Sequence, residues 1–266
     1  MLRTRLFCTI SIFLCALFSS NAQSLESQAV AYERVIYDGA PLQEVNDALG
    51  AKADCYMQLG RYSDAAATLA RVRMFAMTPE ERAAVMYKQE LCWYLCGEFA
   101  QAASLVSELE PDTQEIMLLH ALVLAYAGRY EESEIYAARY ISWDGESPYL
   151  PELLELYKGH PQPRSELSAM LLAVLPPAGH FYNEAYGEGL LSAGLNAGSL
   201  AFTVANLLGG YWVTGIVGGA IAMNYTVMGN QERNAALVAK YNHNSPIEFG
   251  DKLRRFLNLH PVDCNP

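Results

Sequence analysis

The strongest constraint on this fold is a run of 43 residues, 189–231, that contains no charged side chain. One membrane-spanning helix needs about 20 apolar residues, so a run of this length suits two spans and a tight turn. We expect the spans at residues 190–208 and 212–228, with Gly209, Gly210 and Tyr211 in the turn. A buried Gly/Ala-rich pair of helices in a soluble core is the alternative interpretation.

Small residues within this run are regularly spaced. Gly194 and Gly198 lie four apart in the first expected span, and Gly215 and Gly219 lie four apart in the second. This spacing lets helices approach closely in lipid, so the four glycines are predicted to pack the two helices against each other. Three asparagines are costly in hydrocarbon and are expected to face the partner helix. They are Asn196, Asn206 and Asn224.

Most of the charge lies before this run. The chain has 266 residues, of which 52% are apolar, and a net charge of −11. Residues 23–165 contain 22 acidic and 11 basic side chains, whereas residues 166–266 contain 7 and 5. The apolar content excludes a disordered chain, and the acidic balance argues against a nucleic-acid partner. The chain is therefore predicted to join an acidic module to a membrane module.

The N-terminus has the pattern of a targeting segment. Arg3 and Arg5 precede an uncharged apolar stretch at residues 6–18, and Ser20 and Ala22 are the small residues before a cut at Gln23. This pattern predicts a secretory signal peptide at residues 1–22, with an uncleaved membrane anchor as the alternative. We expect the protein in the cell envelope, membrane-anchored, with its acidic module facing the periplasm.

Export permits disulfides among the cysteines that follow the signal peptide. These are Cys55, Cys92, Cys96 and Cys264. Cys92 and Cys96 are four apart on an expected helix, where a bridge is geometrically awkward, so buried free thiols are favoured. No metal site is predicted, because no histidines cluster at ligand spacing.

Three segments of the acidic module share one pattern: a glycine, an aromatic residue two positions later and a small residue three positions after that. The glycines are Gly60, Gly97 and Gly128, the aromatics Tyr62, Phe99 and Tyr130, and the small residues Ala65, Ala102 and Ser133. Glycine ends one helix in the left-handed conformation, the aromatic fills the gap between helices, and the small residue permits close packing. The pattern resembles the tetratricopeptide repeat, a pair of antiparallel helices of about 34 residues. Glu90 departs from it, since a small residue is usual there.

Arrays of this kind present a concave face built from the first helix of each pair. The residues expected to line it are Asp54, Met57, Gln58, Leu91, Tyr94, Leu95, Leu122, Ala125 and Tyr126. This apolar and aromatic surface suits a helix or an extended peptide from a protein partner. The alternative is that the chain's own C-terminal half or a capping helix covers it.

The segment before the uncharged run has a second recognisable pattern. Residues 175–190 read Leu-Pro-Pro-Ala-Gly-His-Phe-Tyr-Asn-Glu-Ala-Tyr-Gly-Glu-Gly-Leu. They resemble the entry sequence Pro-Gly-x-Gly-Gln-x-Tyr-x-Gly-x-x-x-x-Gly of small two-helix membrane domains that follow repeats in exported bacterial proteins. In this chain Pro177 and Ala178 replace a Pro-Gly, and His180 replaces the usual glutamine.

Members of that family commonly end in an Asn/Tyr-rich helix that closes with Lys-Tyr-Asn. The matching positions here are Asn224, Tyr225, Lys240, Tyr241 and Asn242. The resemblance covers about residues 171–242 and implies an architecture but no activity. The aromatic side chains of the entry segment are expected to anchor at the membrane interface. They are Phe181, Tyr182 and Tyr186.

The last residues form a separate pattern. Residues 245–259 alternate apolar and basic side chains at helical spacing, which predicts an amphipathic helix. It would lie on an anionic membrane surface or dock on the acidic repeats, and the second option is favoured because the charges are complementary. The expected organisation is a signal peptide at 1–22, repeats at 23–165, a membrane hairpin at 166–244 and this tail at 245–266.

No constellation for catalysis, cofactor binding or small-molecule recognition is present. His180 and Glu184 are four apart, but they form a single pair without a third partner. Phosphate loops, serine elbows and zinc signatures are missing from the sequence. We therefore expect an all-α protein that is not an enzyme and acts as a membrane-anchored scaffold for protein–protein interaction. An accessory or subunit of a membrane channel or transport assembly is the alternative.

Overall fold

The computed structural model describes residues 24–260, and every regular element in that range is helical. The expectation of an all-α fold is confirmed for this part of the chain. Contacts divide the described residues into two compact units. The first unit contains residues 24–158 and 252–260, and the second unit contains residues 159–251. The expected signal peptide and Cys264 lie outside the described residues.

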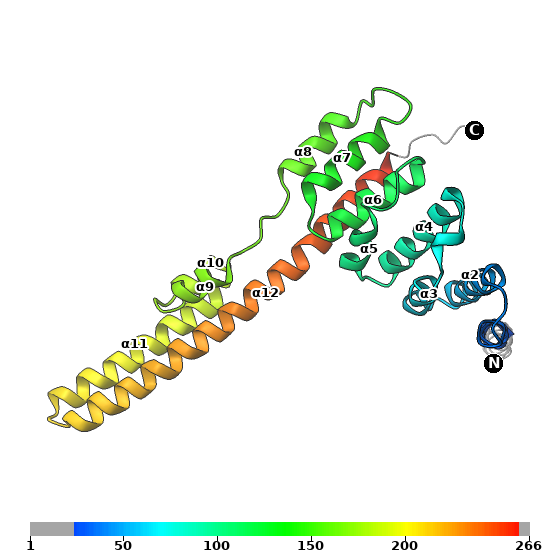
Figure 1. Ribbon diagram of the computed structural model, residues 1–266. Helices are drawn as coiled ribbons and strands as arrows, with labels where there is room; N and C mark the ends of the chain where they lie inside the picture. Colours follow the sequence, from blue (N-terminus) through cyan, green and yellow to red (C-terminus); the bar gives the residue numbers. More distant parts are fainter. Residues whose placement is uncertain (1–23, 261–266) are drawn as a thin grey trace, which may run out of the picture. The chain divides into compact units, whose positions relative to one another are not determined.

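The first unit opens with a helix at residues 24–37 and continues as antiparallel helix pairs (Figure 1). Its labelled elements are α2 (Leu42–Gln58), α3 (Tyr62–Leu69), η1 (Met74–Ala76), α4 (Pro79–Leu95), α5 (Phe99–Leu105), α6 (Gln114–Tyr126), α7 (Tyr130–Ile141) and α8 (Leu150–Lys158). Each helix pair therefore joins a longer first helix to a second helix through a short turn.

The same turn closes the first helix of all three pairs. Gly60, Gly97 and Gly128 have φ of 71°, 83° and 78°, the left-handed region that glycine adopts without a steric penalty. In each case the next residue donates its N–H to a carbonyl five positions back, as Arg61 does to Tyr56 at 2.8 Å. This is the hydrogen bond of a Schellman motif, and it fixes where the second helix begins.

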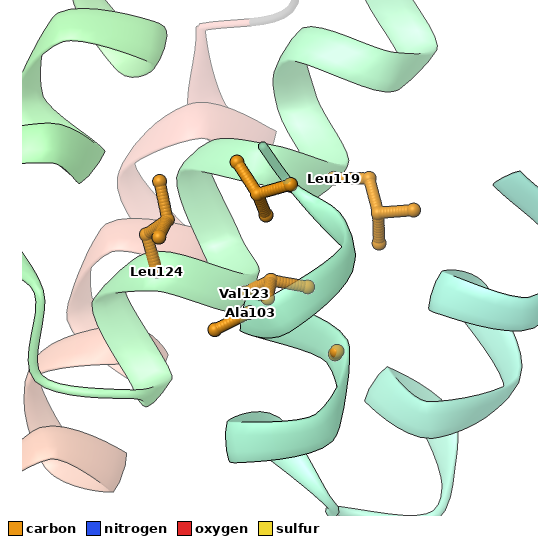
Figure 2. Packing of buried hydrophobic residues seen from close by; sticks show 6 residues of the cluster. Ala103, Leu119, Val123 and Leu124 are labelled. Atoms are coloured by element: carbon orange, nitrogen blue, oxygen red, sulfur yellow. The ribbon is translucent and has the colours of Figure 1, made fainter. Parts of the chain in front are cut away.

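The core lies between the paired helices. Ala65, Ala102 and Ser133, the small residues of the sequence pattern, are fully buried. Figure 2 shows how Ala103, Leu119, Val123 and Leu124 pack together between α5 and α6. Burying a leucine or valine side chain stabilises a fold by about 1.5–3 kcal/mol, so clusters of this size hold the pairs together.

Helix α6 is apolar on all its sides, and ten of its 13 residues are buried. A helix with this pattern belongs in an interior and needs neighbours all round. Figures 1 and 2 both place the last turns of α12 (Gly219–Leu259) alongside it. In these turns Leu253 and Leu257 are buried, and His260 stacks on Tyr149 with ring centroids 3.9 Å apart.

Within the expected tail, residues 252–260 therefore belong to the first unit, whereas residues 245–251 belong to the second. The tail is not a separate helix, because α12 continues through Pro246 to Leu259. Proline lacks the N–H that would bond the carbonyl of Asn242, yet flanking contacts keep the helix continuous. Among these flanking residues, Phe249 and Leu253 are buried.

The second unit contains two short helices and two long ones. They are α9 (Glu166–Leu172), α10 (Ala178–Tyr182), α11 (Tyr186–Leu208) and the part of α12 up to residue 251, which follows the π-helical turn η2 (Thr214–Gly218). Helix α11 and the start of α12 run antiparallel as neighbours (Figure 1). Gly210, with φ of 79°, makes the turn between them, and Tyr211 closes it by donating to the Asn206 carbonyl at 2.9 Å.

Candidate functional site

The open part of the expected groove lies on α2 and α4. Its six residues are at least partly exposed: Asp54, Met57, Gln58, Leu91, Tyr94 and Leu95. Lys88 of α4 bonds Asp54 of α2 at 2.8 Å, which ties the two first helices together. Leu95 is 45% exposed and is the most prominent apolar side chain of this surface.

The third part of the expected groove, on α6, is covered. Leu122, Ala125 and Tyr126 are 8%, 0% and 7% exposed. The Tyr126 ring stacks on Phe99 at 4.6 Å and meets the Tyr94 ring edge-on at 5.7 Å. The nine expected residues therefore do not form one open groove. Tyr126 is covered by Tyr94 of α4 and Phe99 of α5, which belong to the preceding helix pair.

A buried carboxylate–imidazole pair joins α4 to α6 in the first unit. Glu90 of α4 and His120 of α6 are both 0% exposed, and His120 Nε2 lies 3.2 Å from Glu90 Oε2. The edge of the Tyr136 ring packs on His120 with centroids 5.1 Å apart. Burial raises the pKa of Glu90, although the hydrogen bond from His120 acts in the opposite direction. His120 is thus the hydrogen-bond partner of Glu90, the residue that departs from the repeat pattern.

Cys55, Cys92 and Cys96 are free thiols, and of these Cys55 and Cys92 are buried whereas Cys96 is half-buried. Burial raises the pKa of Cys92 to about 11, so this thiol stays protonated at neutral pH. Across residues 24–260, no three His, Cys, Asp or Glu side chains come together in a way that would hold a metal ion.

The second unit has a set of hydrogen-bonded polar side chains that are buried or half-buried. We call them the polar seam: His180, Asn183, Ser192, Asn196, Thr226, Asn230 and Asn234. Ser192 donates to Asn230 at 2.7 Å, Asn183 donates to Asn234 at 2.8 Å, and Thr226 of α12 donates to Asn196 of α11 at 2.9 Å. The seam links α10 and α11 to α12 by hydrogen bonds.

Sequence reasoning missed Asn230 and Asn234. The usable signal was their spacing of four, which places both amides on one face of a helix just where the uncharged run ends. Their partners lie 38 to 51 positions away, and no local pattern specifies those.

The Lys-Tyr-Asn motif holds the start of the second unit. Asn242 accepts from the Arg164 N–H at 2.8 Å and donates to the Arg164 carbonyl at 2.9 Å. The Arg164 guanidinium lies 3.8 Å from the centre of the Tyr241 ring and also pairs with Glu184. The motif therefore has a structural role in which side chains of α12 clamp residue 164.

His180 and Glu184 do not form a site together. Helix α10 ends at Tyr182, and Glu184 has φ of 60°, so the two side chains do not share a helical face. His180 faces Asn230 at 3.4 Å, whereas Glu184 pairs with Arg164.

The four glycines of the long helices divide into two sets. A Cβ added to Gly219 would lie 2.0 Å from Thr203 Oγ1, and one on Gly215 would lie 3.2 Å from Asn206 Cβ, so both glycines face α11. A Cβ added to Gly194 or Gly198 would meet no atom within 4 Å. The expected contact of all four glycines is therefore not formed, because the polar seam turns a different face of α11 toward α12.

The outside of the second unit is apolar. Between residues 186 and 228 the exposed large hydrophobic residues are Tyr186, Leu190, Leu191, Leu195, Leu200, Phe202, Val204, Leu208, Tyr211, Trp212, Val213, Ile216, Val217, Ile221, Met223, Tyr225 and Met228. Among the described helices, α11 alone is long and apolar enough to cross a bilayer, with a mean hydropathy of 1.3. Only 6% of that stretch is buried, whereas the core helix of a soluble protein is mostly buried.

Comparison with protein-family models, with curated proteins and with solved structures finds no match in any of the three. What this chain does must therefore be inferred from the open surface of α2 and α4 and from the inverted polarity of the second unit.

Proposed function

We propose that this protein is an exported, membrane-anchored scaffold. The helix pairs of the first unit, which we interpret as divergent tetratricopeptide repeats, present the surface of α2 and α4 to a protein partner. The second unit holds them at a bilayer as a transmembrane pair of helices. The observation that carries the proposal is the polarity of the second unit, which buries the amides of Asn183, Asn230 and Asn234 and exposes most leucine, valine and aromatic side chains between residues 190 and 228.

This polarity matches lipid as the surrounding solvent. Monomeric soluble proteins rarely expose contiguous apolar patches of more than a few hundred Å². In the hydrocarbon of a bilayer, exposed apolar side chains are favourably solvated. Buried hydrogen bonds then hold helices together, because the hydrophobic effect does not act between them there. Connectivity also supports two spans, because the chain leaves the first unit at residue 158 and rejoins it at residue 252. An even number of spans returns the chain to the side from which it came.

Three equivalent turns support the repeat interpretation. The glycine, aromatic and small positions recur in the same structural roles at each pair, a regularity typical of repeat arrays. The surface of α2 and α4 is short, so it suits a short helical or extended segment. The periplasmic side follows from the expected signal peptide.

Membrane extraction tests the anchor. Native membranes that carry the full chain are washed with alkaline carbonate, and the pellet and supernatant are probed for the protein. We expect the protein in the pellet and its release only by detergent. Release by carbonate alone would contradict the anchor.

A matched pair of substitutions tests the groove. Leu95→Asp adds a charge to the open surface of α4, while Ile135→Asp adds one to α7 at a position with 58% exposure away from the groove. Crosslinking pull-downs of the full chain from native membranes should lose the partner with Leu95→Asp and keep it with Ile135→Asp. Retention of channel or transport subunits by both variants would favour the accessory role in a transport assembly.

A further inference from the structure

A cavity of about 240 Å³ lies beside α12 in the second unit, past the end of the uncharged run. Four polar side chains of α12 line it and make no hydrogen bond or ion pair with any residue from 24 to 260: Lys240, Asn244, Ser245 and Glu248. Two of them carry opposite charges, the ammonium of Lys240 and the carboxylate of Glu248. The cavity therefore offers an unpaired cation and an unpaired anion to a ligand.

These side chains share one face of α12 and follow an order along it. Spacings of four place positions 240, 244 and 248 above one another on the helix, so all three reach the same cavity. Leu237 lies on the side of the proposed spans, Lys240 comes next, and Glu248 lies about 12 Å beyond Lys240 along the helix axis. Going away from the spans, the cavity wall is thus apolar, then cationic, then anionic.

Arg164 adds a second cation to the lining, and its side chain is fixed in place. The guanidinium lies 3.8 Å from the centre of the Tyr241 ring and pairs with Glu184 through Nη2, and the side chain is only 13% exposed. A guanidinium has five N–H groups, and no residue from 24 to 260 accepts from those on Nε or Nη1. These donors can bond an anion without losing the ion pair to Glu184, so an anion next to Lys240 would be bound by two cations.

The apolar surface of the second unit reaches the level of this cavity. Helix α9 begins next to Arg164, which Asn242 bonds, and it packs on α10, whose His180 faces Asn230. It therefore runs along α12 from the level of the cavity toward the level of the spans. Three leucines on α9 or just after it are each at least 65% exposed: Leu167, Leu171 and Leu175. An exposed apolar surface thus extends from the spans to the level of Lys240.

We propose that this cavity binds the headgroup of a zwitterionic phospholipid that ends in a primary ammonium. The order of groups in such a lipid matches the order along α12, with acyl chains toward the spans, the phosphate at Lys240 and Arg164, and the ammonium at Glu248. This inference rests on the membrane location proposed above and adds a lipid ligand to it.

Charge and hydrogen bonding select this headgroup among phospholipids. The unpaired cation and the unpaired anion balance a headgroup without net charge, whereas a purely anionic headgroup would leave Glu248 unpaired. A primary ammonium has three N–H donors, which suit the acceptor oxygens of Glu248, Asn244 and Ser245. A trimethylated amine has no such donor and would leave these oxygens without a partner.

Lipid competition tests this selection. The full chain, purified in detergent, is incubated with the dihexanoyl forms of phosphatidylethanolamine, phosphatidylcholine and phosphatidylglycerol, and bound lipid is measured by native mass spectrometry. Wild type should prefer phosphatidylethanolamine to the other two. Lys240→Ala should weaken the binding of all three about tenfold, because each contains the phosphate. Glu248→Ala should instead abolish the preference for ethanolamine over choline.

Two exposed charges of α12 that do not line the cavity provide matched controls. Lys252→Ala and Glu232→Ala should bind lipid like wild type. Equal binding of the three lipids by wild type, or equal losses in the cavity and control variants, would overturn this inference.

Glycerophosphoethanolamine, which has the same headgroup without acyl chains, identifies the source of the ligand. It should displace the lipid only in large excess, and displacement at equal concentration would replace the lipid by a soluble zwitterion. A carbonate-resistant protein that shows no headgroup preference would overturn this inference alone, while release by carbonate would overturn the membrane location.

Discussion

Both units of this protein are built from α-helices, but they differ in which side chains the helices bury and which they expose. In the first unit, α2 to α8 bury alanine, leucine and valine and turn charged side chains outward, as water requires. In the second unit, α10, α11 and α12 bury histidine, serine and asparagine side chains, and the leucine, valine and aromatic side chains between residues 190 and 228 are mostly exposed. This difference is the one that the proposed membrane location of the second unit requires.

The largest expected effect compares leucines in the two units. Leu124→Ala removes a fully buried side chain from the first unit and should lower the free energy of unfolding by about 2–5 kcal/mol. Leu200→Ala removes a side chain of α11 that is 55% exposed and should change it by no more than about 0.5 kcal/mol. Denaturant unfolding of the full chain in mild detergent, followed by circular dichroism, measures both. A large loss for Leu200→Ala would mean that α11 packs inside a protein core.

A smaller effect tests the polar interior of the second unit. Asn230→Ala takes away the acceptor of Ser192 and leaves buried polar groups without a partner, which should cost about 1–3 kcal/mol. Asn206→Ala is the matched control, because this amide bonds only a carbonyl of its own helix. Thermal unfolding in detergent compares the two. Equal melting temperatures would show that the seam contributes nothing to stability.

The smallest effect concerns the buried pair of the first unit. Because burial raises the pKa of Glu90, the fold favours the protonated carboxyl. The stability that this group contributes is therefore present below its unfolded pKa and lost as the pH rises through its folded pKa. Glu90→Gln abolishes that loss and should stabilise the protein more at pH 8 than at pH 4.5. Melting temperatures at both pH values measure it, with exposed Glu98→Gln as the control, and a pH-independent difference would contradict it.

The sequence by itself determined the features that local chemistry controls. Glycine at positions 60, 97 and 128 sets three left-handed turns, because only glycine adopts that conformation without strain. The helical class, the turn at residues 209 and 210 and the separation of charge from hydropathy could likewise be read from spacing and composition.

Only the tertiary structure decided which surfaces are free. Three features depend on partners 30 or more positions away or on another helix. They are the burial of α6, the pairing of Glu90 with His120 and the orientation of Gly194 and Gly198 away from α12. A spacing of four specifies that two residues share a helical face, but it does not specify which face meets the neighbour. In the second unit, the hydrogen bonds of the polar seam determine which face of α11 meets α12. The reason is that leaving buried amides unpaired costs more free energy than leaving space beside a glycine unfilled.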